Sequence, residues 1–320
     1  MTAYTGIQGQ NILIVSSDPA NPVEGQIWYN TTSNTLKDYQ NVVVAAAWAS
    51  GGNLATARRT LAASTNGTQT ANIVFGGYST GPTGETESYN GTSWSPAPSM
   101  NTDRYYLGGA GTQTAALAFG GKNPTTGATE KWNGSTWTNN PTGLNVARHY
   151  VAGCGTQTTA LAIGGNPGNP PTSAAEAFNG STWTNLTNMT TPRSLATAFG
   201  VSTAAIAFNA SSPPAESWNG SSWTAIANMN TARNGAAASG TQTAGLAFGG
   251  IPARNLTELW NGTAWSTQPT MATGRQYLGG CGTQTSALGA GGYTAPSNTA
   301  ATEEWTGASA TLQTKTITVS

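Results

Sequence analysis

Residues 104–121 read Arg-Tyr-Tyr-Leu-Gly-Gly-Ala-Gly-Thr-Gln-Thr-Ala-Ala-Leu-Ala-Phe-Gly-Gly, and residues 130–137 read Glu-Lys-Trp-Asn-Gly-Ser-Thr-Trp. This pattern occurs six times between about residue 58 and residue 305, once every 40 to 45 residues. Self-similarity of this period predicts a solenoid, a propeller or another array, so that most of the chain forms one structural unit. The glycine that opens the Gly-Thr-Gln-Thr stretch lies at Gly67, Gly111, Gly155, Gly200, Gly240 and Gly282.

The composition restricts the classes of function. Only 8% of the 320 residues are charged and the net charge is zero. This argues against a nucleic-acid partner, because phosphates need clustered Lys and Arg. No apolar run reaches 18 residues, so we expect no membrane insertion, and residues 1–26 lack the pattern of a secretory signal. Cys154 and Cys281 fall in repeats three and six, on opposite sides of a six-part ring, so we expect free, half-buried thiols.

Each repeat predicts four short antiparallel strands. In the quoted copy the first covers 105–110, Gly-Thr-Gln-Thr turns the chain, and the second covers 115–119 before the double glycine. The third strand carries Glu130 and Trp132, and Asn133-Gly134 leads into the fourth, which carries Trp137. Asn-Gly predicts a type I′ hairpin turn, with positive φ at both central residues. The chain is therefore predicted to be all-β.

These features resemble the kelch repeat, with an Arg before the first strand, a double glycine after the second, and an aromatic residue followed by a Trp. The resemblance covers residues 48–305 and implies a six-bladed β-propeller. Repeat four departs from the pattern, because Asn209-Ala210 replaces the double glycine and Gly200-Val-Ser-Thr replaces the usual turn. The double glycines are 76–77, 120–121, 164–165, 249–250 and 291–292; the first aromatics are Tyr89, Trp132, Phe178, Trp218, Trp260 and Trp305; the second are Trp94, Trp137, Trp183, Trp223 and Trp265.

The two ends of the repeat region predict how the ring closes. The last repeat has Trp305 but no following Trp, whereas an unmatched Trp48 precedes the first Arg. We favour a strand over 42–49 that completes the last blade, with the C-terminal strand added outside it. The alternative is that 311–319 fills this place. We therefore expect a short N-terminal arm, residues 1–40, and a propeller over residues 41–320.

Six arginines and six glutamates occupy fixed positions of the repeat. One Arg and one Glu in every blade, set by the fold and not by one pocket, indicate buried structural pairs. The alternatives, a polyanion clamp or an acid/base set, are less favoured. The residues are Arg58, Arg104, Arg148, Arg193, Arg233, Arg275, Glu87, Glu130, Glu176, Glu216, Glu258 and Glu303.

The sequence argues against catalysis. His149 is the one histidine, so no His-based triad or metal cluster can form. Propeller glycosidases need acids that break the repeat symmetry, and the copper oxidases built on kelch propellers need His and Tyr ligands. We expect no enzyme, no cofactor and no metal.

Recognition is expected in the loops between the second and third strands. These loops differ in length and sequence, and each contains proline, which lowers the entropy lost on binding. Variable, solvated loops without function are the alternative for any single residue. The candidate ligand-binding residues are Tyr78, Lys122, Asn123, Asn166, Asn169, Arg254, Asn255, Tyr293 and Asn298.

The N-terminal segment suggests a biological context. Residues 24–37 contain Gly25-Gln-Ile-Trp-Tyr-Asn30, which resembles short segments of tail-fibre and other virion proteins of tailed bacteriophages. The repeat also resembles propellers encoded by marine and cyanobacterial phages. The resemblance implies a virion surface protein whose residues 1–40 contact other virion proteins and whose propeller binds a host-surface glycan or protein.

Other functions stay open. A purely structural virion component (a collar, fibre or capsid decoration) is the second hypothesis, and a cellular kelch scaffold for protein–protein contacts is the third. Self-association through residues 1–40 or 311–320 is also open.

Overall fold

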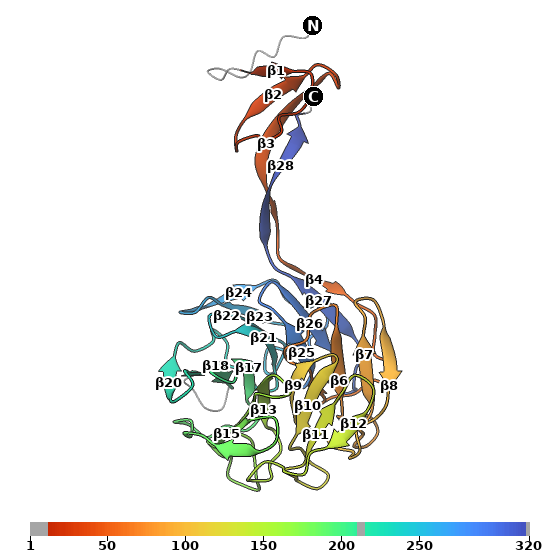
Figure 1. Ribbon diagram of the computed structural model, residues 1–320, viewed down its shortest axis with the longest axis vertical. Helices are drawn as coiled ribbons and strands as arrows, with labels where there is room; N and C mark the ends of the chain where they lie inside the picture. Colours follow the sequence, from red (N-terminus) through yellow and green to blue (C-terminus); the bar gives the residue numbers. More distant parts are fainter. Residues whose placement is uncertain (1–11, 210–214, 318–320) are drawn as a thin grey trace. The chain divides into compact units, whose positions relative to one another are not determined.

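The computed structural model describes residues 12–209 and 215–317 and separates the chain into two compact units. The first consists of residues 1–46 and 308–320, and the second of residues 47–307. All regular elements in the described residues are β-strands, most of which are labelled in Figure 1. The chain is therefore divided after residue 46 and not after residue 40, and residues 308–320 lie outside the propeller.

The second unit contains six four-stranded antiparallel sheets (Figure 1). In five of them the four strands are consecutive in the chain. These five are β5 (Ala62–Ala63), β6 (Asn72–Phe75), β7 (Thr86–Tyr89) and β8 (Trp94–Ala97); β9 (Gly108–Thr112), β10 (Ala115–Phe119), β11 (Thr129–Trp132) and β12 (Trp137–Asn139); β13 (Ala152–Gly155), β14 (Ala160–Ile163), β15 (Ala175–Phe178) and β16 (Trp183–Asn185); β17 (Thr197–Val201), β18 (Ala204–Phe208), β19 (Ala215–Trp218) and β20 (Trp223–Ile226); and β21 (Ala237–Thr241), β22 (Ala244–Phe248), β23 (Thr257–Trp260) and β24 (Trp265–Gln268).

The sheets are the blades of a β-propeller. The first strand of each blade lies beside the first strands of its two neighbours, and β25 (Gly279–Gly282) lies beside β5, so the ring is closed. Small residues of these strands line a central channel. A Cβ atom added to Gly109 would lie 2.4 Å from the carbonyl oxygen of Ala63 in the neighbouring blade, so no side chain fits there. The predicted six-bladed all-β architecture is confirmed.

The sixth blade joins the two ends of the repeat region. It contains β25, β26 (Ser286–Ala290), β27 (Thr302–Thr306) and β4 (Ala47–Ser50), in which Trp48 pairs with Trp305. Trp48 therefore supplies the missing strand, as favoured from the sequence, and the alternative over 311–319 is wrong.

Two details of the expected closure are wrong. Residues 42–44 belong to β3 (Thr35–Val44) of the first unit, and β28 (Ser309–Thr316) pairs with β3 instead of lying outside β4. Thr306 pairs with Ala47, and Ser309 pairs with Val44, so both ladders keep the same residue offset. The pairing of β27 with β4 therefore has the same register as the pairing of β28 with β3.

The double glycines connect each blade to the next. Gly120 and Gly121 have φ values of 63° and 112°. The amide of Gly121 donates to the carbonyl of Arg148 at 2.9 Å, and a Cβ on Gly120 would lie 2.7 Å from the same oxygen. Positive φ and close approach both require glycine here. In repeat four, the side chain of Asn209 donates to the carbonyl of Ser194 in the same blade at 2.9 Å, and Ala210 lies outside the described residues.

The fourth-strand tryptophans form a second link between blades. Trp137 Nε1 donates to Thr86 Oγ1 at 3.0 Å, and Trp183 Nε1 donates to Thr129 Oγ1 at 2.9 Å. In each case the acceptor begins the third strand of the preceding blade. The same bond from Trp94 to Thr302, at 2.9 Å, joins the first blade to the sixth.

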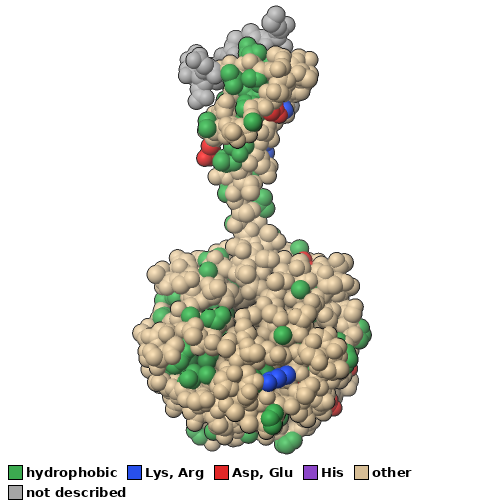
Figure 2. Space-filling view, in the orientation of Figure 1, with side chains coloured by type: hydrophobic (Ala, Val, Ile, Leu, Met, Phe, Trp, Pro, Cys, Tyr) green, Lys and Arg blue, Asp and Glu red, His purple; other side chains and the backbone are tan. Residues whose placement is uncertain are grey.

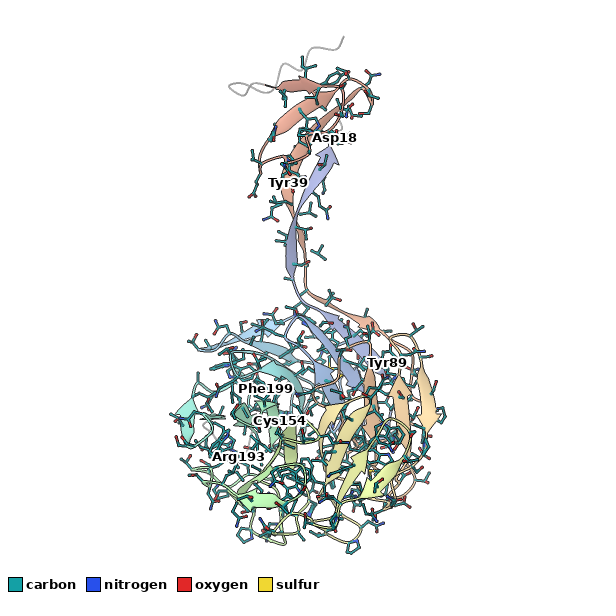
Figure 3. The ribbon with its side chains drawn as sticks, in the orientation of Figure 1. Asp18, Tyr39, Tyr89, Cys154, Arg193 and Phe199 are labelled. Atoms are coloured by element: carbon teal, nitrogen blue, oxygen red, sulfur yellow. The ribbon has the colours of Figure 1, made fainter. Side chains whose placement is uncertain are left out.

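The first unit is a four-stranded sheet of β1 (Leu13–Val15), β2 (Ile27–Asn30), β3 and β28. Trp28 is fully buried, and its indole N–H donates to Asp18 Oδ1 at 3.0 Å. Asn30 donates to the same oxygen at 2.8 Å, and Lys37 lies 2.6 Å from Asp18 Oδ2 (Figure 3 labels Asp18). These bonds lower the pKa of Asp18 to about 2. Trp28 and Asn30, which belong to the N-terminal motif, thus both donate hydrogen bonds to the carboxylate of Asp18.

Two local expectations are corrected. In the Asn-Gly turns only the glycine has positive φ, for example 94° at Gly134, while the Asn133 side chain accepts the amides of Ser135 and Thr136. A type I′ turn over Asn133-Gly134 needs positive φ at both residues, so the prediction of type I′ was wrong. Cys154 (Figure 3) and Cys281 are free, as expected, but fully buried instead of half-buried. Burial raises the pKa of Cys154 to about 12.

Candidate functional site

The candidate site lies where the loops between second and third strands meet the starts of the first strands. In five of the six blades, an isolated bridge pairs the residue after the blade arginine with the residue after the double glycine. We call this surface the loop face. Its bridges are Arg59 with Tyr78, Tyr105 with Lys122, His149 with Asn166, Asn234 with Ile251, and Gln276 with Tyr293.

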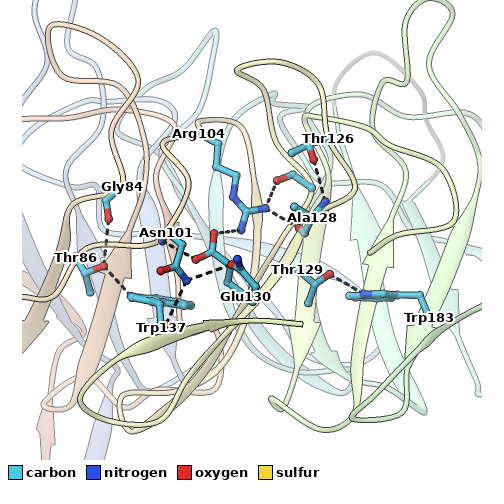
Figure 4. A network of polar contacts seen from close by, with 12 residues as sticks. Gly84, Thr86, Asn101, Arg104, Thr126, Ala128, Thr129, Glu130, Trp137 and Trp183 are labelled. Carbon is cyan, nitrogen blue, oxygen red and sulfur yellow. Dashed lines mark hydrogen bonds and ion pairs between the residues drawn. The ribbon is translucent and has the colours of Figure 1, made fainter. Parts of the chain in front are cut away.

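Below the loop face, each blade arginine is paired with the glutamate of its own repeat. Arg104 Nη2 lies 2.8 Å from Glu130 Oε1, and both side chains are buried (Figure 4). The second glutamate oxygen accepts the amide of Asn101 at 2.7 Å. Burial lowers the pKa of Arg233 and of Arg275 to about 10. The six pairs are Arg58–Glu87, Arg104–Glu130, Arg148–Glu176, Arg193–Glu216, Arg233–Glu258 and Arg275–Glu303.

These arginines also hold the bases of the loops. Arg104 Nη1 donates to the carbonyls of Gly120 at 2.8 Å and Ala128 at 2.6 Å, one on each side of the loop (Figure 4). Arg233 makes the same bonds to Gly249 at 3.1 Å and Leu256 at 2.5 Å. A guanidinium that bridges a carboxylate and two carbonyls fixes the loop geometry.

At the centre of the loop face, one residue from each blade forms the mouth of the channel. The six residues share a left-handed backbone with φ between 55° and 61°. Backbone bonds run from blade to blade: the amide of Tyr106 donates to Thr60, that of Tyr150 to Tyr106, and that of Tyr277 to Gly235. The mouth residues are Thr60, Tyr106, Tyr150, Leu195, Gly235 and Tyr277.

Three tyrosines make the mouth asymmetric. The ring centroids of Tyr106 and Tyr150 are 3.9 Å apart, and those of Tyr106 and Tyr277 are 5.8 Å apart. Burial, together with a hydrogen bond to Tyr150, raises the pKa of Tyr106, and burial raises the pKa of Tyr277. These hydroxyls therefore stay protonated at neutral pH. They give the mouth aromatic rings that carry hydrogen-bonding groups.

Arg59 brings three of the predicted residues together. Its guanidinium carbon lies 4.9 Å from the ring centroids of both Tyr78 and Tyr293. Its Nη1 donates to Asn298 Oδ1 at 3.0 Å, and Asn298 Nδ2 donates to the carbonyls of Tyr78 at 3.0 Å and Ser79 at 2.9 Å. Tyr78 stands edge-on to Tyr105, with centroids 5.4 Å apart. We call Arg59, Tyr78, Tyr293 and Asn298 the Arg59 cluster.

The other predicted residues do not converge on the Arg59 cluster. Lys122 is exposed beside Tyr105, and Asn123 Nδ2 donates to the carbonyl of Asp103 at 3.3 Å. Asn166 caps its own loop by accepting the amide of Gly168 at 2.9 Å. The remaining three lie on the loops of blades three and five: Asn169 and Asn255 are exposed, and Arg254 is half-buried.

Sequence reasoning missed the mouth tyrosines and Arg59. The signal was present, because the two positions after each conserved-looking Arg vary among six otherwise similar repeats. His149, at the first of these positions, is buried beside Tyr150, and burial, with the nearby charge of Lys122, lowers its pKa.

The surroundings of the site carry little charge. On the face drawn in Figure 2, most of the propeller surface is backbone and side chains that are neither hydrophobic nor charged, and charged side chains are few and scattered. Within residues 12–209 and 215–317 no three His, Cys, Asp or Glu side chains are grouped to hold a metal ion. The same residues include no helix long and apolar enough to cross a membrane.

Comparisons with known proteins bear on the fold. No model of a protein family matches the chain, and no curated protein matches it. Among solved structures it is similar to one described as "Structure of YjhT", with a TM-score of 0.63 and 12% identity. The match covers 82% of this chain and 99% of that one. At this identity the similarity shows a common fold and nothing about activity.

Proposed function

We propose that the protein is a non-enzymatic virion surface protein of a tailed bacteriophage, of the tail-fibre or adhesin type. Its kelch-like propeller binds a host-surface glycan through the channel mouth and the Arg59 cluster. A glycan is favoured over a protein ligand because tyrosine rings stack on the apolar faces of sugars while their hydroxyls bond to sugar oxygens.

One observation carries the ligand-binding part of this proposal: the loop face breaks the symmetry that the rest of the propeller keeps. The buried Arg–Glu pairs are the same in every blade. At the mouth, by contrast, Tyr106, Tyr150 and Tyr277 share one backbone position with Leu195 and Gly235. Left-handed backbone at a bulky residue is unfavourable, and such strain is concentrated at functional sites.

Binding of the purified full-length chain to host cells and to a glycan array tests the proposal. The substitutions Tyr150→Leu and Tyr277→Leu suit the backbone, because Leu195 has the same conformation with a φ of 56°. We expect each of these, and Tyr78→Ala and Tyr293→Ala, to weaken binding about fivefold or more, since a stacked ring contributes about 1 kcal/mol or more. Thr224→Ala, on an outer strand, is the control and leaves binding unchanged. Absence of binding to cells and glycans contradicts the proposal.

A purely structural virion role is the second candidate. It is favoured by apolar side chains exposed in the first unit, such as Ile14 (70%), Val23 (67%) and Val43 (71%). Ile14 and Val23, which lie within residues 1–40, also support contact between that segment and other virion proteins. A cryo-EM map of the particle separates the candidates, since loops buried against neighbours favour structure and loops in solvent favour adhesion. Absence of the protein from purified particles by mass spectrometry favours a cellular scaffold.

A further inference from the structure

Arg58 and Arg59 are adjacent in the sequence but differ in their partners. Arg58 is fully buried and lies 3.0 Å from Glu87 Oε1. Arg59 is half-buried, and no carboxylate of the described residues lies within ion-pair distance of it. Glu85, which is on the same blade, instead lies 3.7 Å from Arg58. A partly desolvated cation without a counter-ion favours the binding of an anion.

The guanidinium of Arg59 is held in place. Two tyrosine rings and Asn298 fix it, and Asn298 is itself fixed by two carbonyls of the neighbouring loop. A guanidinium has five N–H donors, and the structure gives a protein acceptor, Asn298 Oδ1, to only one nitrogen of Arg59 in the described part of the chain. The remaining N–H groups are available to a ligand. Because the side chain is already ordered, binding costs little further entropy.

The residues around Arg59 indicate what kind of molecule carries the anion. Tyr78 contacts Tyr105, Tyr105 contacts Tyr106 at 5.0 Å between centroids, and Tyr106 contacts Tyr150. Aromatic rings thus run from the Arg59 cluster to the mouth, which suits successive sugar rings. Exposed Lys122 pairs with Tyr105 in an isolated bridge.

We infer that the Arg59 cluster binds the carboxylate of an acidic saccharide unit, such as a hexuronic acid, whose neighbouring units stack on the tyrosines. This inference rests on the proposed function, because it specifies the class of glycan that the loop face takes. The carboxylate accepts hydrogen bonds from the N–H groups of Arg59. It supplies the negative charge that no carboxylate of the described residues provides.

Isothermal titration of the full-length chain tests the inference. The probes are oligomers of galacturonate, glucuronate and mannuronate, each with its carboxyl-reduced neutral form, and oligoglutamate as an acidic peptide. Because hydrogen bonds between charged groups are strong, we expect at least one uronate oligomer to bind about tenfold or more tighter than its reduced form at low salt. This difference in affinity becomes smaller at high salt. Arg59→Gln removes this difference, whereas Arg59→Lys keeps part of it.

Lys315→Gln is the control, because it removes an exposed cation of strand β28 that is not among the candidate ligand-binding residues, and it leaves the preference unchanged. The melting temperature of each variant verifies folding, and Arg59→Lys remains the test if Arg59→Gln does not fold. Equal binding of acidic and reduced oligomers overturns the inference and leaves glycan binding standing. Tighter binding of oligoglutamate than of any uronate also overturns it. Absence of binding to every saccharide overturns both the inference and the proposed function.

Discussion

At the scale of single residues, neighbouring arginines have opposite roles. Arg58 belongs to the repeat and is neutralised inside the blade by Glu87, whereas Arg59 belongs to one blade only and faces two tyrosines. The pattern of the repeat identifies the first kind, because all six copies agree. It does not identify the second kind, whose surroundings come from the loops of two blades.

Arg193→Ala is expected to lower the free energy of unfolding by about 3–5 kcal/mol, because it leaves the buried Glu216 without its partner. Urea unfolding followed by tryptophan fluorescence measures the change. Arg254→Ala, in a loop, is the control and stays within about 0.5 kcal/mol of the unmodified chain. Equal stabilities of the two variants would show that the blade pair contributes nothing.

At the scale of elements, the third strands differ in whether they offer a hydroxyl to the next blade. Where the strand begins with Thr, as at Thr86 and Thr129, the tryptophan of the following blade bonds to it. Blade three begins this strand with Ala175, and Trp223 donates instead to the carbonyl of Thr187 at 3.2 Å. The indole N–H thus finds an acceptor in either case, as buried donors require.

Thr129→Val is expected to destabilise the protein by about 1–3 kcal/mol, because the shape is kept while the buried indole N–H of Trp183 loses its acceptor. Thr138→Val, on the exposed side of the adjacent strand β12, is the control. Chemical unfolding of both variants measures the difference. An unchanged free energy for Thr129→Val would mean that Trp183 finds another acceptor, as Trp223 does.

The sheet of the first unit is expected to depend on pH through Asp18. Its pKa is lowered from 3.8 to about 2, so the carboxylate contributes stability above pH 3.8 that is lost as the pH falls towards 2. The indole N–H signal of Trp28 in NMR spectra should therefore keep its position at pH 3.8 and shift near pH 2. Asp18→Asn removes this transition. A midpoint near pH 3.8 contradicts the bonding described.

At the scale of the whole molecule, ring closure depends on residues that are far apart in the sequence. Trp48 Nε1 donates to Thr257 Oγ1 at 2.9 Å, and Gly292 donates its amide to Arg58 at 2.8 Å. The sixth blade thus contacts both its neighbours through bonds that also occur between other blades, and it needs a strand from the start of the chain. Because the ring is closed, the first strand of every blade has a neighbouring first strand on both sides.

Two fragments test the closure. Residues 47–307 contain all six complete blades and are expected to melt within a few degrees of the full chain. Residues 53–307 lack β4, so they expose Trp305 and leave Thr257 without its partner. We expect their melting temperature to fall by more than about 5 °C, since burial of a large side chain contributes about 1.5–3 kcal/mol. Calorimetry measures both, and equal melting temperatures contradict the role of β4.

The sequence by itself determined the all-β class, the number of blades and the Trp48 closure. Each of these follows from the sequence repeat, because the same residues recur at the same spacing six times along the chain. It did not show that residues 42–44 leave the blade, because three consecutive valines suit a strand of either sheet. It also did not specify the turn type, since φ at Asn133 depends on how its side chain caps the turn.

Only the tertiary structure decided which residues form the site. Arg59, Tyr78 and Tyr293 come from the first and sixth blades, and they meet because the ring brings its two ends together. Tyr106, Tyr150 and Tyr277 are separated by more than forty residues each, yet they share one mouth because the blades have the same geometry. A repeat predicts what every blade has in common. The chemistry of the loop face arises from positions where blades differ, and only their arrangement in space shows which of these are neighbours.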